Sequence, residues 1–216
     1  MVTPAPAPAA ILWYIADPMC SWCWGFSPVI EAIRDEYADR LEIALILGGL
    51  RPGTSEAVTP EFRTEILEHW RHVHDATGQP FQFDGAMPEG FVYDTEPPSR
   101  AVIAVSEIDP EATFAMFRAV QQAFYAEQRD VTLGNVLGQL AADLRIEATA
   151  FAECFDSNTV RDKTQAHFQL ARQMGVRGFP TVLLQKAEAY RLLTYGYRPL
   201  DDLRPDIDRW LADLPE

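Results

Sequence analysis

The chain has 216 residues, 48% of them hydrophobic and 23% charged, a composition typical of a globular protein with a sizeable core. Its 32 acidic residues outnumber 18 basic ones, which gives a formal net charge of -14. A surface this acidic repels phosphate backbones and anionic lipid headgroups, so we expect neither nucleic acid nor membrane as a partner.

The first ten residues, MVTPAPAPAA, have neither the basic nor the long apolar stretch of a secretory signal. Their alternating Pro and Ala predict a disordered lead-in over 1–10. No later segment approaches the length of a membrane span. If Met1 is the native start, we therefore expect a cytoplasmic protein.

Two apolar runs, 11–17 and 41–48, predict buried strands. Between them a helix is expected to run to about Ala38, with an apolar face that includes Phe26 and Ile30 and a kink at Pro28. A strand–helix–strand unit of this kind implies a right-handed crossover and parallel pairing.

Only helical segments are predicted from 51 to 156, with starts at Thr59, Ser99, Asp109, Thr132 and Glu147. A long helix then ends at Gly175, strands at 181–185 and 191–197 form an antiparallel pair, and Pro199 opens a last helix. We predict an α/β fold in which 11–50 and 157–216 form one domain and 51–156 an inserted helical domain.

Cys20 and Cys23 form a CxxC pair between the first strand and the following helix. A structural zinc site needs four ligands, and no second pair supplies them, so we expect no metal. A disulfide between them closes too small a loop to stabilise the fold much. At a helix start, the free amides and the helix dipole stabilise a thiolate and lower its pKa, so the position favours redox chemistry.

Far downstream, GVRGFPTVLL (175–184) leads from a helix into a strand. Pro180 stands where the strand begins, which suits either an ordinary trans proline or a cis Phe179-Pro180 bond.

Together, DPMCSWCWGF (17–26) and GVRGFPTVLL resemble the DsbA-like branch of the thioredoxin superfamily, in particular its cytoplasmic predicted protein-disulfide isomerases and FrnE-type oxidoreductases. The resemblance covers about 11–213. It implies a thioredoxin fold, βαβ…αββα, with the helical insertion. It also implies a cis Phe179-Pro180 bond facing the pair, with Cys20 as the exposed attacking sulfur and Cys23 as the resolving one.

Aromatic residues surround the pair. Trp22, Trp24 and Phe26 are expected to form an apolar rim for substrate, with Trp22 exposed and core packing as the alternative for Trp24. Phe179 and Pro180 are expected to contact substrate through the backbone beside the proline. Asp17 could accept a proton from Cys23 or cap the turn before Pro18.

Other candidates receive structural interpretations. His69, His72 and His74 are interpreted as surface histidines rather than as a metal site, and Cys154 as a small apolar residue on its helix. The dipeptide Ser21-Trp22 carries no cation, unlike the Pro-His of the strongest oxidants of the family. A smaller decrease in the pKa of Cys20 and a less oxidising pair are therefore expected.

The sequence thus predicts a thiol–disulfide oxidoreductase, a reductase or isomerase, that needs no bound cofactor. Its expected partners are polypeptide or small-molecule thiols and disulfides, with glutathione as a possible co-substrate. One alternative is a glutathione-dependent enzyme of the kappa-class transferase or 2-hydroxychromene-2-carboxylate isomerase type, which usually has Ser at the first cysteine position. Another is a chaperone-like client binder without enzymatic activity.

Overall fold

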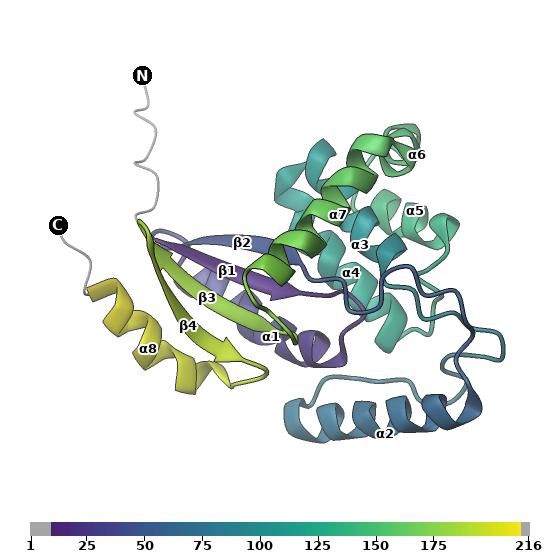
Figure 1. Ribbon diagram of the computed structural model, residues 1–216, viewed down its shortest axis with the longest axis horizontal. Coiled ribbons are helices and arrows are strands. Elements are labelled where there is room, and N and C mark those ends of the chain that lie inside the picture. The colour runs from purple at the N-terminus through teal and green to yellow at the C-terminus, as the bar shows by residue number, and fades with distance from the viewer. Residues whose placement is uncertain (1–9, 213–216) are drawn as a thin grey trace.

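A four-stranded sheet forms the centre of the computed structural model, which describes residues 10–212 (Figure 1). Its strands are β1 (Ile11–Ala16), β2 (Glu42–Leu47), β3 (Thr181–Lys186) and β4 (Ala189–Tyr195), in the order β2-β1-β3-β4. The predicted parallel β1–β2 pair and antiparallel β3–β4 pair are confirmed, and β3 joins them by running antiparallel to β1.

Residues 1–9 of the predicted lead-in lie outside the described residues. Ala10, its last residue, is buried, and its carbonyl accepts a hydrogen bond from the Glu42 amide at 3.1 Å. Ala10, predicted as part of the lead-in, therefore belongs to the fold.

Successive side chains of a strand point to opposite faces of the sheet, and apolar side chains lie on both faces here. Helices therefore cover both faces. Leu12, Val182 and Leu184 share a core with α1 (Ser21–Glu36) and α8 (Leu200–Ala212). On the other face, α7 (Asn158–Gln173) packs Ala171 against Ile15 and Ile46. Figure 1 shows α7 passing over the strands, with α8 beside β4.

The segment between β2 and α7 is helical, as predicted. It contains α2 (Pro60–Thr77), α3 (Glu96–Ile108), a 3-10 turn (Pro110–Ala112), α4 (Thr113–Tyr125), α5 (Gly134–Asp143) and α6 (Ala148–Asp156). Within the described residues its only β-type pairing is an isolated bridge between Ala57 and Val92. One continuous core joins these helices to α1 and the sheet.

Side-chain caps explain which helix starts were predictable. Thr59 accepts a hydrogen bond from the Phe62 amide, and Glu147 accepts bonds from the first turn of α6. The cap predicted at Thr132 is wrong by one residue, because the N-cap of α5 is Leu133, while Asp130 binds both the amide and the hydroxyl of Thr132 and holds a turn there. Likewise, α3 begins at Glu96 rather than Ser99, since two prolines occupy its first turn.

Pro28 lies inside α1, which nevertheless continues to Glu36. Proline has no amide hydrogen to bond the carbonyl four residues earlier, that of Trp24. This carbonyl accepts instead from Ser27 Oγ at 2.8 Å and from Gln79 Nε2 at 2.9 Å. The loop after α2 thereby satisfies a carbonyl that the proline leaves without its helical partner.

Candidate active site

Cys20 is the N-cap residue of α1, at the end of the turn that follows β1. Its amide donates to the Asp17 carbonyl at 3.1 Å, and its own backbone is extended. The sulfur therefore lies at the end of the helix where free amides and the dipole stabilise negative charge, as the sequence predicted.

The two sulfurs differ in accessibility. Cys20 is 7% exposed, whereas Cys23, one turn further into α1, is 0% exposed. Cys20 is thus less open than predicted, but it is the cysteine of the pair that has exposed surface. The third cysteine, Cys154, is half-buried, and its thiol lies 3.5 Å from the Ala104 carbonyl.

The peptide bond between Phe179 and Pro180 is cis, as the resemblance implied. Cys20 Sγ donates to the Phe179 carbonyl at 3.5 Å, across 159 residues of sequence. Gly48 makes this approach possible, since a Cβ atom there would lie 2.1 Å from the Phe179 ring. The proline loop therefore faces the cysteine pair.

Cys23 lies in a protected environment behind Cys20. Burial raises the pKa of the Cys23 thiol well above its usual range, and the neighbouring Cys20 raises it further. Burial likewise raises the pKa of Tyr14 on β1, with a further contribution from Cys23. Cys23 therefore holds its proton strongly.

Asp17 is 0% exposed and lies close enough to Cys23 to affect its titration. Its two carboxyl oxygens accept hydrogen bonds from the Met19 amide at 2.9 Å and the Leu50 amide at 2.7 Å. Burial raises the pKa of Asp17 to about 6, although these two bonds act in the opposite direction. Asp17 therefore caps the turn, the alternative considered above, and it also titrates near neutral pH, as a proton acceptor requires.

Trp22, between the cysteines, is half-buried rather than exposed. Its ring packs edge-on against His69 and His72 of α2, with centroids 6.0 and 5.5 Å away, and stacks on Tyr197 at 6.1 Å. The two histidines thus belong to the surroundings of the active site, a placement that the sequence analysis missed. In the described part of the chain, no three His, Cys, Asp or Glu side chains are grouped so as to hold a metal ion.

The predicted substrate rim is wrong for two of its members. Trp24 is 1% exposed, stacks on Tyr125 and donates its indole N–H to the Pro80 carbonyl at 2.9 Å. Phe26 is 0% exposed and packs against Tyr14. Both are core residues: Trp24 packs against the helical insertion, and Phe26 packs against Tyr14 of β1 and Tyr197.

A cavity of about 450 Å³ opens beside Cys20. We call it the Cys20 cavity; it is lined by residues 19–22, by Leu50 and Arg51, by Phe62, Glu65, Ile66, His69 and Trp70 of α2, and by Tyr93 and Phe179. The thioredoxin part thus supplies the sulfur, and the insertion supplies most of the opposite wall.

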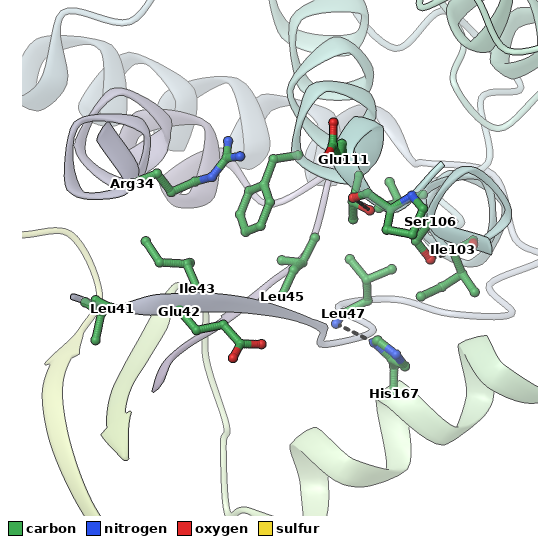
Figure 2. A pocket seen from close by; sticks show the side chains of 14 residues that line it. Arg34, Leu41, Glu42, Ile43, Leu45, Leu47, Ile103, Ser106, Glu111 and His167 are labelled. Carbon is green, nitrogen blue, oxygen red and sulfur yellow. Dashed lines mark hydrogen bonds between the residues drawn. The ribbon is translucent and has the colours of Figure 1, made fainter. Parts of the chain in front are cut away.

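A second cavity, of about 470 Å³, lies between β2, α1 and α3 (Figure 2). His167 of α7 lines it, and its Nδ1 accepts the Leu47 amide at 3.3 Å. Burial lowers the pKa of His167, which favours the neutral ring that this bond requires. Neither cysteine of the pair lines this cavity.

A four-stranded sheet, a CxxC pair at a helix start and a facing cis-proline define a thioredoxin-fold protein of the kind that carries thiol–disulfide exchange. Residues 12–208 match the family described as the DSBA-like thioredoxin domain, and the chain belongs to that family.

Three relatives show how widely the similarity extends. A structure from Nitrosomonas europaea, described as a candidate protein disulfide isomerase, is 48% identical, has a TM-score of 0.90 and covers 95% of this chain and 99% of its own. The cytosolic disulfide reductase DsbM from Pseudomonas aeruginosa is 30% identical, with a TM-score of 0.79 and coverage of 94% and 98%. It also has a structure with GSH, at a TM-score of 0.76.

More distant is the ClpXP adapter protein SpxH from Halalkalibacterium halodurans, which is 23% identical over 79% of this chain. The match spans 56% of that relative's length. Separately, none of the helices within residues 10–212 is both long enough and apolar enough to span a bilayer.

Proposed function

We propose that this protein is a thiol–disulfide oxidoreductase that works through Cys20 and Cys23. One arrangement carries the proposal: Cys20 caps α1, lies 3.5 Å from the carbonyl of the cis-proline loop and shields a fully buried Cys23. A sulfur at a helix start with a second thiol one turn behind it can both attack a disulfide and be released again.

In the proposed reaction, the Cys20 thiolate attacks one sulfur of a substrate disulfide, and the other sulfur leaves as a thiolate. Cys23 then transfers its proton to the Asp17 carboxylate and attacks Cys20 Sγ. This step forms the Cys20–Cys23 disulfide and releases the reduced substrate. The same steps in reverse oxidise a substrate dithiol. Phe179 and Pro180 would contact the substrate backbone, and Trp22 its apolar side chains.

We propose that the pair acts in the reducing or isomerising direction, in the cytoplasm. Burial, followed by the neighbouring His72, lowers the pKa of His69, so this ring is neutral at pH 7 and adds no positive charge near Trp22. The Ser21-Trp22 dipeptide adds none either. Compared with a Pro-His dipeptide, these residues stabilise the Cys20 thiolate less, which makes the disulfide a weaker oxidant. The cytosolic reductase named above supports this direction and location.

Glutathione is the co-substrate we propose, in place of a bound cofactor, alongside polypeptide or small-molecule disulfides. The relative solved with GSH supports this choice. The kappa-class or isomerase alternative would use glutathione without redox turnover, but Cys20 stands where those enzymes usually have Ser. The adapter name of the distant relatives gives the binding alternative its support.

The Cys23→Ser variant tests the proposal. Mixed with glutathione disulfide, it should accumulate a mixed disulfide on Cys20, because no second thiol is present to resolve it. Wild type should not accumulate this species. Peptide mapping by mass spectrometry locates the adduct and distinguishes Cys20 from Cys154. An adduct confined to Cys154, or none at all, would contradict the proposed roles.

A further inference from the structure

Arg51 has a position in the Cys20 cavity that the exchange chemistry described so far does not use. It follows β2 and two glycines, and it is the single Lys or Arg among the described residues that line this cavity. From its place in the structure we propose that Arg51 binds a carboxylate of a small thiol such as glutathione, next to Cys20. This inference rests on the proposed function and specifies which residue recognises the co-substrate.

The backbone of Arg51 is fixed from three directions. Its amide donates to Thr95 Oγ1 at 3.0 Å, and its carbonyl accepts from the Thr54 hydroxyl at 3.1 Å. The preceding amide, that of Leu50, donates to Asp17. A residue held in this way presents its side chain to the cavity with little further ordering on binding.

The guanidinium is held mainly by aromatic rings. Arg51 Cζ lies 4.6 Å from the Phe62 ring centre and 5.9 Å from that of Tyr93. Tyr93 is fixed in turn, since its hydroxyl donates to the Met19 carbonyl at 2.6 Å. Stacking on aromatic faces orients a guanidinium and leaves its N–H edge available for a planar anion.

The guanidinium of Arg51 lacks a hydrogen-bond acceptor at its Nε–H within the described residues. Arg51 Nε is buried, and in residues 10–212 it has no hydrogen-bond partner. Nor does any carboxylate of those residues form an ion pair with Arg51, although Glu65 lines the same cavity. A buried guanidinium N–H without an acceptor is unfavourable, and a carboxylate is the ligand that satisfies it with two parallel bonds.

The size of the cavity favours a small thiol over a polypeptide. Its volume of about 450 Å³ lies in the range of about 300–1,000 Å³ that is typical of sites for small ligands. Glutathione carries a carboxylate on each side of its thiol, so one of them can approach Arg51 while the sulfur attacks Cys20 Sγ. In that attack the new S–S bond forms, the Cys20–Cys23 bond breaks, and Cys23 leaves as a thiolate that takes up a proton. A second glutathione thiolate then attacks the sulfur of the bound glutathione, so that glutathione disulfide leaves and Cys20 is reduced.

The test compares two thiols on the oxidised full-length protein. Rate constants for reduction by glutathione and by 2-mercaptoethanol, which has no carboxylate, are measured by tryptophan fluorescence. Their ratio cancels any change in the reactivity of the disulfide itself. In Arg51→Gln the ratio should fall about tenfold, the effect expected for losing one charge-assisted hydrogen-bonded contact of about 1.4 kcal/mol. Arg51→Lys should retain part of the preference.

Arg71→Gln is the matched control, because Arg71 is exposed on α2 and does not line the cavity. A ratio within twofold of wild type in Arg51→Gln, or an equal loss in Arg71→Gln, would overturn the inference. The inference would also be overturned if Arg51→Gln reacted more slowly than wild type only with a peptide disulfide that ends in a carboxylate. That result would mean that Arg51 binds polypeptide substrates instead of a small thiol. If wild type reacts with neither thiol, it is the proposed function that fails.

Discussion

Cys20→Ser is expected to abolish disulfide exchange, lowering the rate by about a thousandfold or more, because a serine hydroxyl does not ionise near neutral pH and forms no disulfide. The measurement is the glutathione-driven reduction of a peptide disulfide, followed by release of its thiol. Cys20 is the one thiol of the pair that reaches the cavity, so Cys23 cannot replace it.

Cys154→Ser is the control for Cys20→Ser. Its hydroxyl can keep the bond to the Ala104 carbonyl, and its activity should equal that of wild type. Two results would contradict the account: exchange that persists in Cys20→Ser, or exchange that is lost in Cys154→Ser. A variant that lacks exchange but still binds an unfolded client at wild-type affinity would show that binding is a separate property.

Asp17→Asn should slow the resolving step by about a hundredfold at pH 8, the lower end of the effect that a general base usually contributes. In wild type, the rate of this step should fall as the pH falls through about 6, where Asp17 takes up a proton. Stopped-flow release of glutathione from the Cys20 mixed disulfide measures it directly.

Asp94→Asn is the matched control for the kinetics, because Asp94 lies near Asp17 and its carboxylate binds the Gly53 and Glu96 amides. Its pH profile should match that of wild type. Two results would contradict a proton-transfer role for Asp17: a wild-type rate that does not change between pH 5 and 8, or a pH dependence that is the same in Asp17→Asn as in wild type.

The same residue predicts a pH-dependent stability. Because burial raises the pKa of Asp17 from 3.8 to about 6 in the folded protein, folding favours the protonated form. The stabilisation of the folded protein by protonated Asp17 is complete below about pH 4 and is lost as the pH rises through about 6. A difference of this size corresponds to about 3 kcal/mol. Urea unfolding measures this as the free energy of unfolding of Asp17→Asn minus that of wild type. The difference should be about 3 kcal/mol larger at pH 8 than at pH 4. A difference that is the same at both pH values would contradict the burial of a titrating carboxyl.

The sheet could be predicted because its strands are short apolar runs whose order restricts the pairing. The strand predicted at 191–197 begins instead at Ala189, since the turn before it is only two residues long and Ala187 adopts a positive φ of 48°. Nothing in local sequence shows that a non-glycine residue will accept that conformation. The division into domains at 51 and 157 remains a prediction.

The site was only partly predictable, for a different reason. Cys20, Cys23 and Pro180 belong to motifs that can be read locally, and their proximity followed from the family resemblance. The burial of Trp24 and the placement of His69 and Arg51 depend on where the insertion packs against α1. The shared helical face of Glu65, His69 and His72 was visible in the sequence, but no local signal indicated that it faces Trp22.

The reduction potential of the Cys20–Cys23 pair shows whether this pair is a reducing redox centre. The protein is equilibrated in glutathione or dithiothreitol buffers and followed by the fluorescence of Trp22 and Trp24, the tryptophans nearest the pair in sequence. We expect one reversible two-electron transition at about -270 to -230 mV, between the value of thioredoxin and that of the most reducing glutaredoxins. A value near about -120 mV would mean a strong oxidant and contradict the reducing direction. If no transition occurs, the pair is not a redox centre.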